Sequence, residues 1–230
     1  MSPVDINHGG STPAEKVVIK PSAPVLVGVT DAALVDREEK IVLAGTVTSD
    51  YWLSRWRSTG ALDLDFGADG RASADISGST DNATGVVELD DGRLAIAGSA
   101  NGQLVVGVYT VTGAPDETVG VDGFLYPDVT MFGVSGLNTL ARDAEGRFLA
   151  LGYVTTPLPV PVVVRLLPDG LLDPSFGDGG VAFLDFDGWP SSSATAFSLV
   201  LDADGRPVVS CTIGDIGAGT GRIGVARLWP

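Results

Sequence analysis

The sequence is poor in the residues from which most catalytic and metal centres are built. Among 230 residues there is one histidine, His8, and one cysteine, Cys211. A Ser-His-Asp triad or a histidine-based metal site would need His8, which lies ahead of the patterned part of the chain, so both are disfavoured. One cysteine excludes an internal disulfide and a multi-cysteine metal site, and its apolar surroundings predict a buried packing thiol. We therefore expect no metal and no cofactor.

Positive charge and long apolar runs are also scarce. The chain has 14 Lys and Arg against 29 Asp and Glu, a formal net charge of −15. This charge repels phosphate backbones and anionic lipid, so we expect neither nucleic acid nor a membrane as a partner. No apolar run approaches the ~20 residues of a membrane span. Residues 1–10 lack the basic and apolar regions of a secretory signal, which favours a cytoplasmic protein and leaves leaderless export open.

What the sequence does contain is a repeat. A turn followed by an apolar strand occurs four times, with a basic residue at Lys40, Arg93, Arg147 and Arg206, in steps of 53, 54 and 59. A second anchor, in a glycine-rich junction, recurs in steps of 53 and 57 at Gly67, Gly120 and Gly177. Two independent anchors with similar periods predict tandem structural units.

Each unit reads as short strands joined by hairpins, because Asp-Gly and Glu-Gly turns separate apolar runs. Four strands per unit are typical of a propeller blade. We therefore predict an all-β fold, a β-propeller built from four tandem four-stranded repeats, with the fourth strand expected at 71–76, 124–129 and 181–186. The predicted limits are a flexible tail at 1–15 and one domain at 16–230, with repeats at about 16–58, 59–111, 112–168 and 169–230.

The glycine-rich junction also carries a family resemblance. Residues 172–180 read Leu-Asp-Pro-Ser-Phe-Gly-Asp-Gly-Gly, residues 62–70 are a close variant, and residues 116–123 have lost the serine and the phenylalanine. With the Asp-x-Gly-Arg hairpin that follows, this element resembles the delta-60 repeat family, a bacterial β-propeller repeat. The resemblance covers about residues 16–229. It implies a propeller architecture and brings no catalytic motif.

The two ends of the chain are phased to complement each other. The last unit ends after its third strand at 222–229, and Lys16–Lys20 fits the missing fourth strand. We expect the N-terminal strand to complete the last blade, because this removes an open sheet edge. The same phasing allows a monomeric ring of four blades or a homodimeric ring of eight, and both stay open.

One charge pair recurs in the units. Arginines share a place in the third strand and aspartates one in the fourth: Arg55, Arg165 and Arg227, and Asp75, Asp128 and Asp185. The offset is 20 residues in both intact units, which predicts a salt bridge between neighbouring strands or blades. The same four residues, Arg55, Asp75, Arg165 and Asp185, are candidate ligand-binding positions.

The breaks in this pattern are candidate catalytic positions. Val108 replaces the arginine opposite Asp128, and Lys20 replaces the aspartate opposite Arg227. If buried, an unpaired carboxylate has a raised pKa and two cations need an anion between them. The alternative is repeat drift at exposed positions.

A further candidate for ligand binding is Trp189, in an inserted loop at 187–192. An exposed loop tryptophan suits sugar stacking or a partner contact, and the alternative is a ring that covers the core.

Three functions follow from these features. The sequence favours a non-catalytic propeller that binds a small molecule, a glycan or a protein. The alternatives are a small-molecule enzyme that uses Asp128 or the Lys20 and Arg227 pair without a metal, and a carbohydrate-binding module that uses Trp189.

Overall fold

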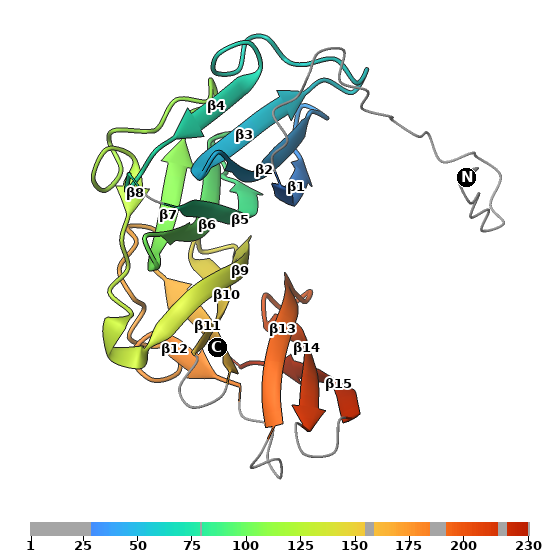
Figure 1. Ribbon diagram of the computed structural model, residues 1–230, viewed down its shortest axis with the longest axis vertical. Coiled ribbons are helices and arrows are strands. Elements are labelled where there is room, and N and C mark those ends of the chain that lie inside the picture. Colours follow the sequence, from blue (N-terminus) through green and yellow to red (C-terminus); the bar gives the residue numbers. More distant parts are fainter. Residues whose placement is uncertain (1–28, 79, 155–158, 185–191, 216–219, 230) are drawn as a thin grey trace, which may run out of the picture.

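The computed structural model describes residues 29–78, 80–154, 159–184, 192–215 and 220–229, which form four antiparallel sheets (Figure 1). The first contains β1 (Val29–Val35), β2 (Ile41–Val47), β3 (Asp50–Trp56) and β4 (Arg71–Ala74). The second contains β5 (Asp81–Glu88), β6 (Leu94–Ala100), β7 (Gln103–Tyr109) and β8 (Phe124–Leu125). The third, after the 3-10 turn η1 (Thr130–Phe132), contains β9 (Val134–Arg142), β10 (Phe148–Val154), β11 (Val160–Leu166) and β12 (Val181–Phe183). The fourth contains β13 (Ser192–Leu201), β14 (Pro207–Asp215) and β15 (Thr220–Arg227).

In every sheet the strands lie side by side in chain order. The turn between the first and second strands contains a residue with positive φ, which is Gly92, Gly146 or Gly205 in three sheets and Glu39 in the first. Glycine adopts this backbone conformation without steric cost, which is why Asp-Gly turns mark these hairpins in the sequence.

The chain-order topology places the connections at two opposite ends of the sheets. One end, the turn face, carries the hairpins between first and second strands and the loops 57–70, 110–123 and 167–180 between third and fourth strands. The other end, the link face, carries the β2–β3 and β6–β7 hairpins, the end of β4, the start of β5 and the link 126–133 between the second and third sheets.

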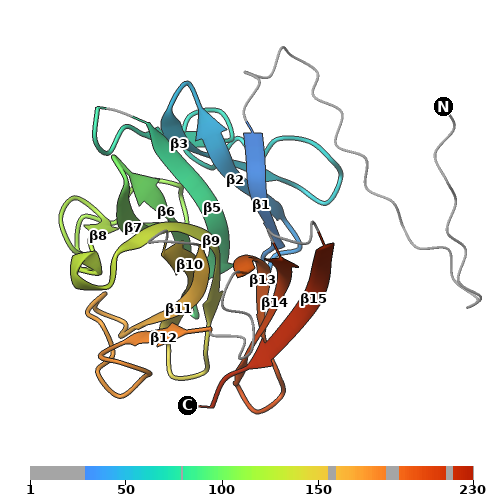
Figure 2. The same ribbon diagram turned by 60° about the horizontal axis from the view of Figure 1, so that its bottom comes forward.

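The sheets pack as consecutive blades. β1 packs against β5, β5 against β9 and β9 against β13, and Figures 1 and 2 show the four sheets following one another around an arc. Three apolar cores fill the junctions between them. In β6, Leu94 and Ile96 face the first blade while Ala95 and Ala97 face the third. Because both faces of a blade are buried in this way, its second strand reads as a continuous apolar run.

The predicted all-β class is confirmed, and the four antiparallel sheets of three or four strands are consistent with propeller blades. No core cluster of the described residues joins the fourth blade to the first. The fourth sheet has three strands where the others have four. Lys16–Lys20 and the tail at 1–15 lie outside the described residues, so strand completion and the number of blades stay predictions.

The fourth strands are shorter than the sequence analysis expects. β8 ends at Leu125 and β12 at Phe183. After β8 the chain reaches Pro127, which has no N–H for a strand ladder, and then turns into η1. No helix among the described residues is long and apolar enough to cross a membrane.

Candidate functional site

The buried arginine of the first blade pairs with an aspartate of the turn face. Arg55 Nε donates to Asp63 Oδ2 at 2.8 Å, and the Lys40 Nζ atom lies 3.0 Å from the same oxygen. The Arg55 guanidinium stacks on the Phe66 ring, 4.6 Å from its centroid. Arg55 is 8% exposed and Asp63 1%. Burial alone would raise the pKa of Asp63, but the hydrogen bonds from Lys40 and Arg55 outweigh it and hold the pKa below its ordinary value.

The third blade repeats this cluster. Arg165 Nε donates to Asp173 Oδ2 at 2.9 Å, and the guanidinium lies 4.4 Å from the centroid of the Phe176 ring. Ser175 Oγ donates to Asp173 Oδ1 at 2.6 Å. We call each set of arginine, aspartate and phenylalanine the Arg-Asp-Phe cluster. Its charges are buried and satisfied within the protein, as a structural ion pair requires.

The predicted pairing of Arg55 with Asp75 is therefore wrong. The loop after β3 folds back so that Asp63 N donates to Arg55 O at 2.9 Å, which brings the Asp63 carboxylate to the guanidinium. Asp75 follows β4 at the opposite end of the sheet, is exposed, and accepts a hydrogen bond from Gly78 N at 2.6 Å. Arg165 likewise takes a partner from its own turn-face loop, and Asp185 lies outside the described residues.

The second blade loses the arginine but not the pairing. Asp116 occupies the place of Asp63, and Arg93 from the neighbouring hairpin approaches it at 2.7 Å. The catalytic reading of Asp128 required a buried carboxylate without a partner, and the position is instead exposed, as the alternative of repeat drift predicts. Asp128 is exposed at the link face, and hydrogen bonds from the Thr130 hydroxyl (2.6 Å) and the Thr130 N–H (3.2 Å) lower its pKa instead of raising it.

The other candidates of the sequence analysis do not form a site in the described residues. The Arg227 side chain is 51% exposed, lies 3.7 Å from Asp202 and stacks against the Trp229 ring. Lys20 and Trp189 lie outside the described residues.

The link face brings together a set of carboxylates that the sequence analysis missed. Single oxygens of Asp50, Asp75 and Asp81 all lie within 4.8 Å of one another. Asp81 is fully buried and accepts hydrogen bonds from Ile76 N at 2.7 Å and Ser77 Oγ at 2.5 Å. Oxygen ligands of this kind suit a hard cation such as Ca²⁺, so these three side chains could hold one. Asp75 and Asp81 flank the same link between blades, whereas Asp50 comes from the β2–β3 hairpin. The spacing of the three residues in the sequence therefore does not predict that they meet.

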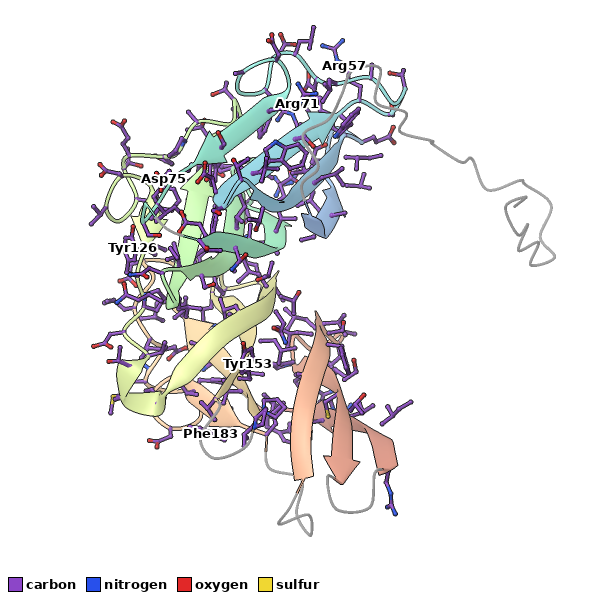
Figure 3. All side chains as sticks on the ribbon, in the orientation of Figure 1. Arg57, Arg71, Asp75, Tyr126, Tyr153 and Phe183 are labelled. Carbon is purple, nitrogen blue, oxygen red and sulfur yellow. The ribbon has the colours of Figure 1, made fainter. Side chains whose placement is uncertain are left out.

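A hollow of about 380 Å³ opens at the same link face, between the β6–β7 hairpin and the link from the second blade to the third. Its lining includes Gln103, Tyr126, Asp128 and Thr130. Tyr126 is 46% exposed. Partial burial, and then the charges of Asp122 and Asp81, raise the Tyr126 pKa. Figure 3 shows Asp75 and Tyr126 on the same side of the molecule.

Comparison with known proteins identifies the fold. A family model described as a domain of unknown function (DUF5122) beta-propeller matches residues 149–176, which run from β10 through the Arg-Asp-Phe cluster of the third blade. Among solved structures, the endo-arabinase of Bacteroides thetaiotaomicron is similar at 15% identity and a TM-score of 0.51, over 87% of this chain and 75% of that one. The α-L-arabinanase of Cellvibrio cellulosa gives 12% identity and a TM-score of 0.46, over 86% and 72%. No curated protein matches the sequence.

The fold is thus that of a β-propeller, with a distant structural similarity to glycoside hydrolase propellers. At 15% identity the likeness to the endo-arabinase concerns the fold alone. The family match ends at Phe176 and includes none of Asp50, Asp75, Asp81, Tyr126 and Asp128.

Proposed function

We propose that this protein is a non-catalytic binding propeller that takes a neutral, hydroxyl-rich ligand such as a saccharide at the link face, in the hollow beside Tyr126. The observation that carries the proposal is that Tyr126, which is 46% exposed, lines one hollow together with Gln103 and Asp128. An aromatic ring that offers its apolar face, with a few polar groups around it, is the usual composition of a small-molecule site.

The state of Asp128 supports binding over catalysis. Its hydrogen bonds from Thr130 lower the pKa and keep the carboxylate ionised. An ionised carboxylate accepts hydrogen bonds from sugar hydroxyls, whereas a general acid must hold its proton near neutral pH. Glycoside hydrolysis needs one carboxyl group of raised pKa, and Asp128 is shifted in the opposite direction.

The test is titration calorimetry against a panel of neutral oligosaccharides, with the hits repeated on variants. Tyr126→Ala is expected to weaken binding about tenfold through loss of the stacking surface. Asp128→Asn is expected to weaken it as well. Trp229→Ala, which removes an aromatic ring 69% exposed on the fourth blade, is the matched control and leaves the affinity unchanged.

Two results would overturn the proposal. One is a panel with no ligand, or with ligands whose affinity is the same for Tyr126→Ala and the wild type. The other is the release of new reducing ends from a bound oligosaccharide, which would make the protein an enzyme.

A further inference from the structure

One side of the fourth blade is exposed at positions where the other three blades are buried. The strand register aligns Leu53, Val106, Val163 and Val225, which pair with Ala44, Ala97, Leu151 and Ser210. The first three are at most 1% exposed, while Val225 is 66% exposed. Two residues earlier in β15, Ile223 is 86% exposed, and its counterparts Tyr51 and Leu104 are 0% and 5% exposed.

In the first three blades this side is covered by the innermost strand of the next blade. The covering residues occupy one register position in β5, β9 and β13: Val86, Leu140 and Leu199. They are 6 to 8% exposed because each packs into the core that the preceding blade contributes. The exposed side of the fourth blade, which includes Val200 at 56% exposure, has the composition of such a junction.

The matching half of this junction lies at the other end of the chain. Ala33 in β1 has the register position of Val86, since Ala33 pairs with Leu43 and Val86 with Ile96. Ala33 is exposed, and Val35 two residues later is 67% exposed. In the same blade Trp52 and Trp56 are buried. The exposed surface that remains at this end of the arc therefore belongs to the innermost strand, β1. β1 and the side of the fourth blade lie at opposite ends of the arc, and no core of the described residues joins them.

We propose that two copies of this chain join head to tail, with the fourth blade of each covering β1 of the other. The occupant of the exposed side is then the innermost strand of a second copy, packed as β5, β9 and β13 pack within one chain. Both junctions form together under one two-fold axis, so the assembly closes at two subunits. The three junctions within the chain are the model for this contact, and they show that the surface is built to be buried.

Sedimentation velocity over a range of concentrations tests the pairing. The expected species has twice the 23.5 kDa mass of the chain. Val225→Lys and Ala33→Arg lie on the two halves of the junction, and each is expected to raise the dimer dissociation constant at least about tenfold. Met131→Lys, at a side chain 82% exposed in η1, is the control and leaves the dimer intact. Near-ultraviolet circular dichroism checks that each variant is folded.

Chemical cross-linking then separates a second copy from closure within one chain. Chains carrying Ala33→Cys are mixed with chains carrying Val200→Cys, both with Cys211→Ala, and treated with a bis-maleimide. A cross-link between the two chains is expected. A wild type that stays monomeric, a dimer indifferent to both junction variants, or an intrachain cross-link in the Ala33→Cys, Val200→Cys double variant would each overturn the proposal.

Discussion

The turn face and the link face treat the same residue type in opposite ways. At the turn face Asp63 and Asp173 are buried, and each lies within 2.9 Å of an arginine nitrogen. At the link face Asp50, Asp75 and Asp81 lie close together, and no ion pair to any of them occurs among the described residues. A buried carboxylate at the turn face is neutralised by an arginine, whereas the three link-face carboxylates lie close together without a cation among the described residues, so their charges repel one another. The repeat thus places buried ion pairs at the turn face, and the carboxylate cluster and the hollow at the link face.

The largest expected effect is that of acid pH on the thermal unfolding midpoint. Asp63 and Asp173 have pKa values lowered by folding, so their contribution is complete above the unfolded pKa of about 3.9 and is lost as the pH falls through the lower folded values. Thermal unfolding followed by circular dichroism should show a midpoint that falls steeply below about pH 4. Asp63→Asn with Asp173→Asn should flatten this fall. A midpoint that rises on acidification below pH 4 would show that the turn-face carboxylates do not stabilise the fold.

The second largest effect is expected when one partner of a buried ion pair is removed. Asp173→Asn leaves the Arg165 guanidinium, 4% exposed, without its counter-charge. We expect the free energy of unfolding to fall by about 3 kcal/mol, measured by urea denaturation. Asp178→Asn, at an exposed aspartate of the same loop, is the matched control and should change it by less than about 0.5 kcal/mol. An equal decrease in the free energy of unfolding in the two variants would show that the buried aspartate contributes no more than an exposed one.

The smallest expected effect has the opposite sign. Asp50→Asn removes one of three neighbouring negative charges, so in the presence of a chelator we expect the free energy of unfolding to rise by up to about 1 kcal/mol. The measurement is the same urea denaturation. Asp65→Asn, at an exposed turn-face aspartate, serves as the control for a change of net charge.

The fold was predictable because its signals are local. Residues that suit a hairpin, such as Gly92 and Gly146 after an acidic residue, recur at a nearly constant step, and the apolar strands follow them directly. The burial of both sides of each blade extends this signal along whole strands. The early end of β8 was missed, although Pro127 and the turn after it mark it.

The ion pairs and the carboxylate cluster were less predictable, because they depend on which strand ends and loops lie at the same face of the sheets. A constant offset of 20 residues suggested that Arg55 pairs with Asp75, but β3 and β4 are antiparallel and place the two at opposite faces. The partner, Asp63, is only eight residues away, in a loop that folds back on its own strand. The cluster of Asp50 with Asp81 carries no sequence signal, since the two belong to different blades.

We expect the paired aspartates Asp63 and Asp173 to stabilise the fold at the turn face, and the mutual repulsion of Asp50, Asp75 and Asp81 to destabilise it at the link face. The most direct test measures Asp173→Asn and Asp50→Asn side by side, by urea denaturation at neutral pH with a chelator present. We expect a lower free energy of unfolding for Asp173→Asn and a higher one for Asp50→Asn. A lower value in both variants would contradict this expectation, because the link-face carboxylates would then support the fold as the turn-face ones do.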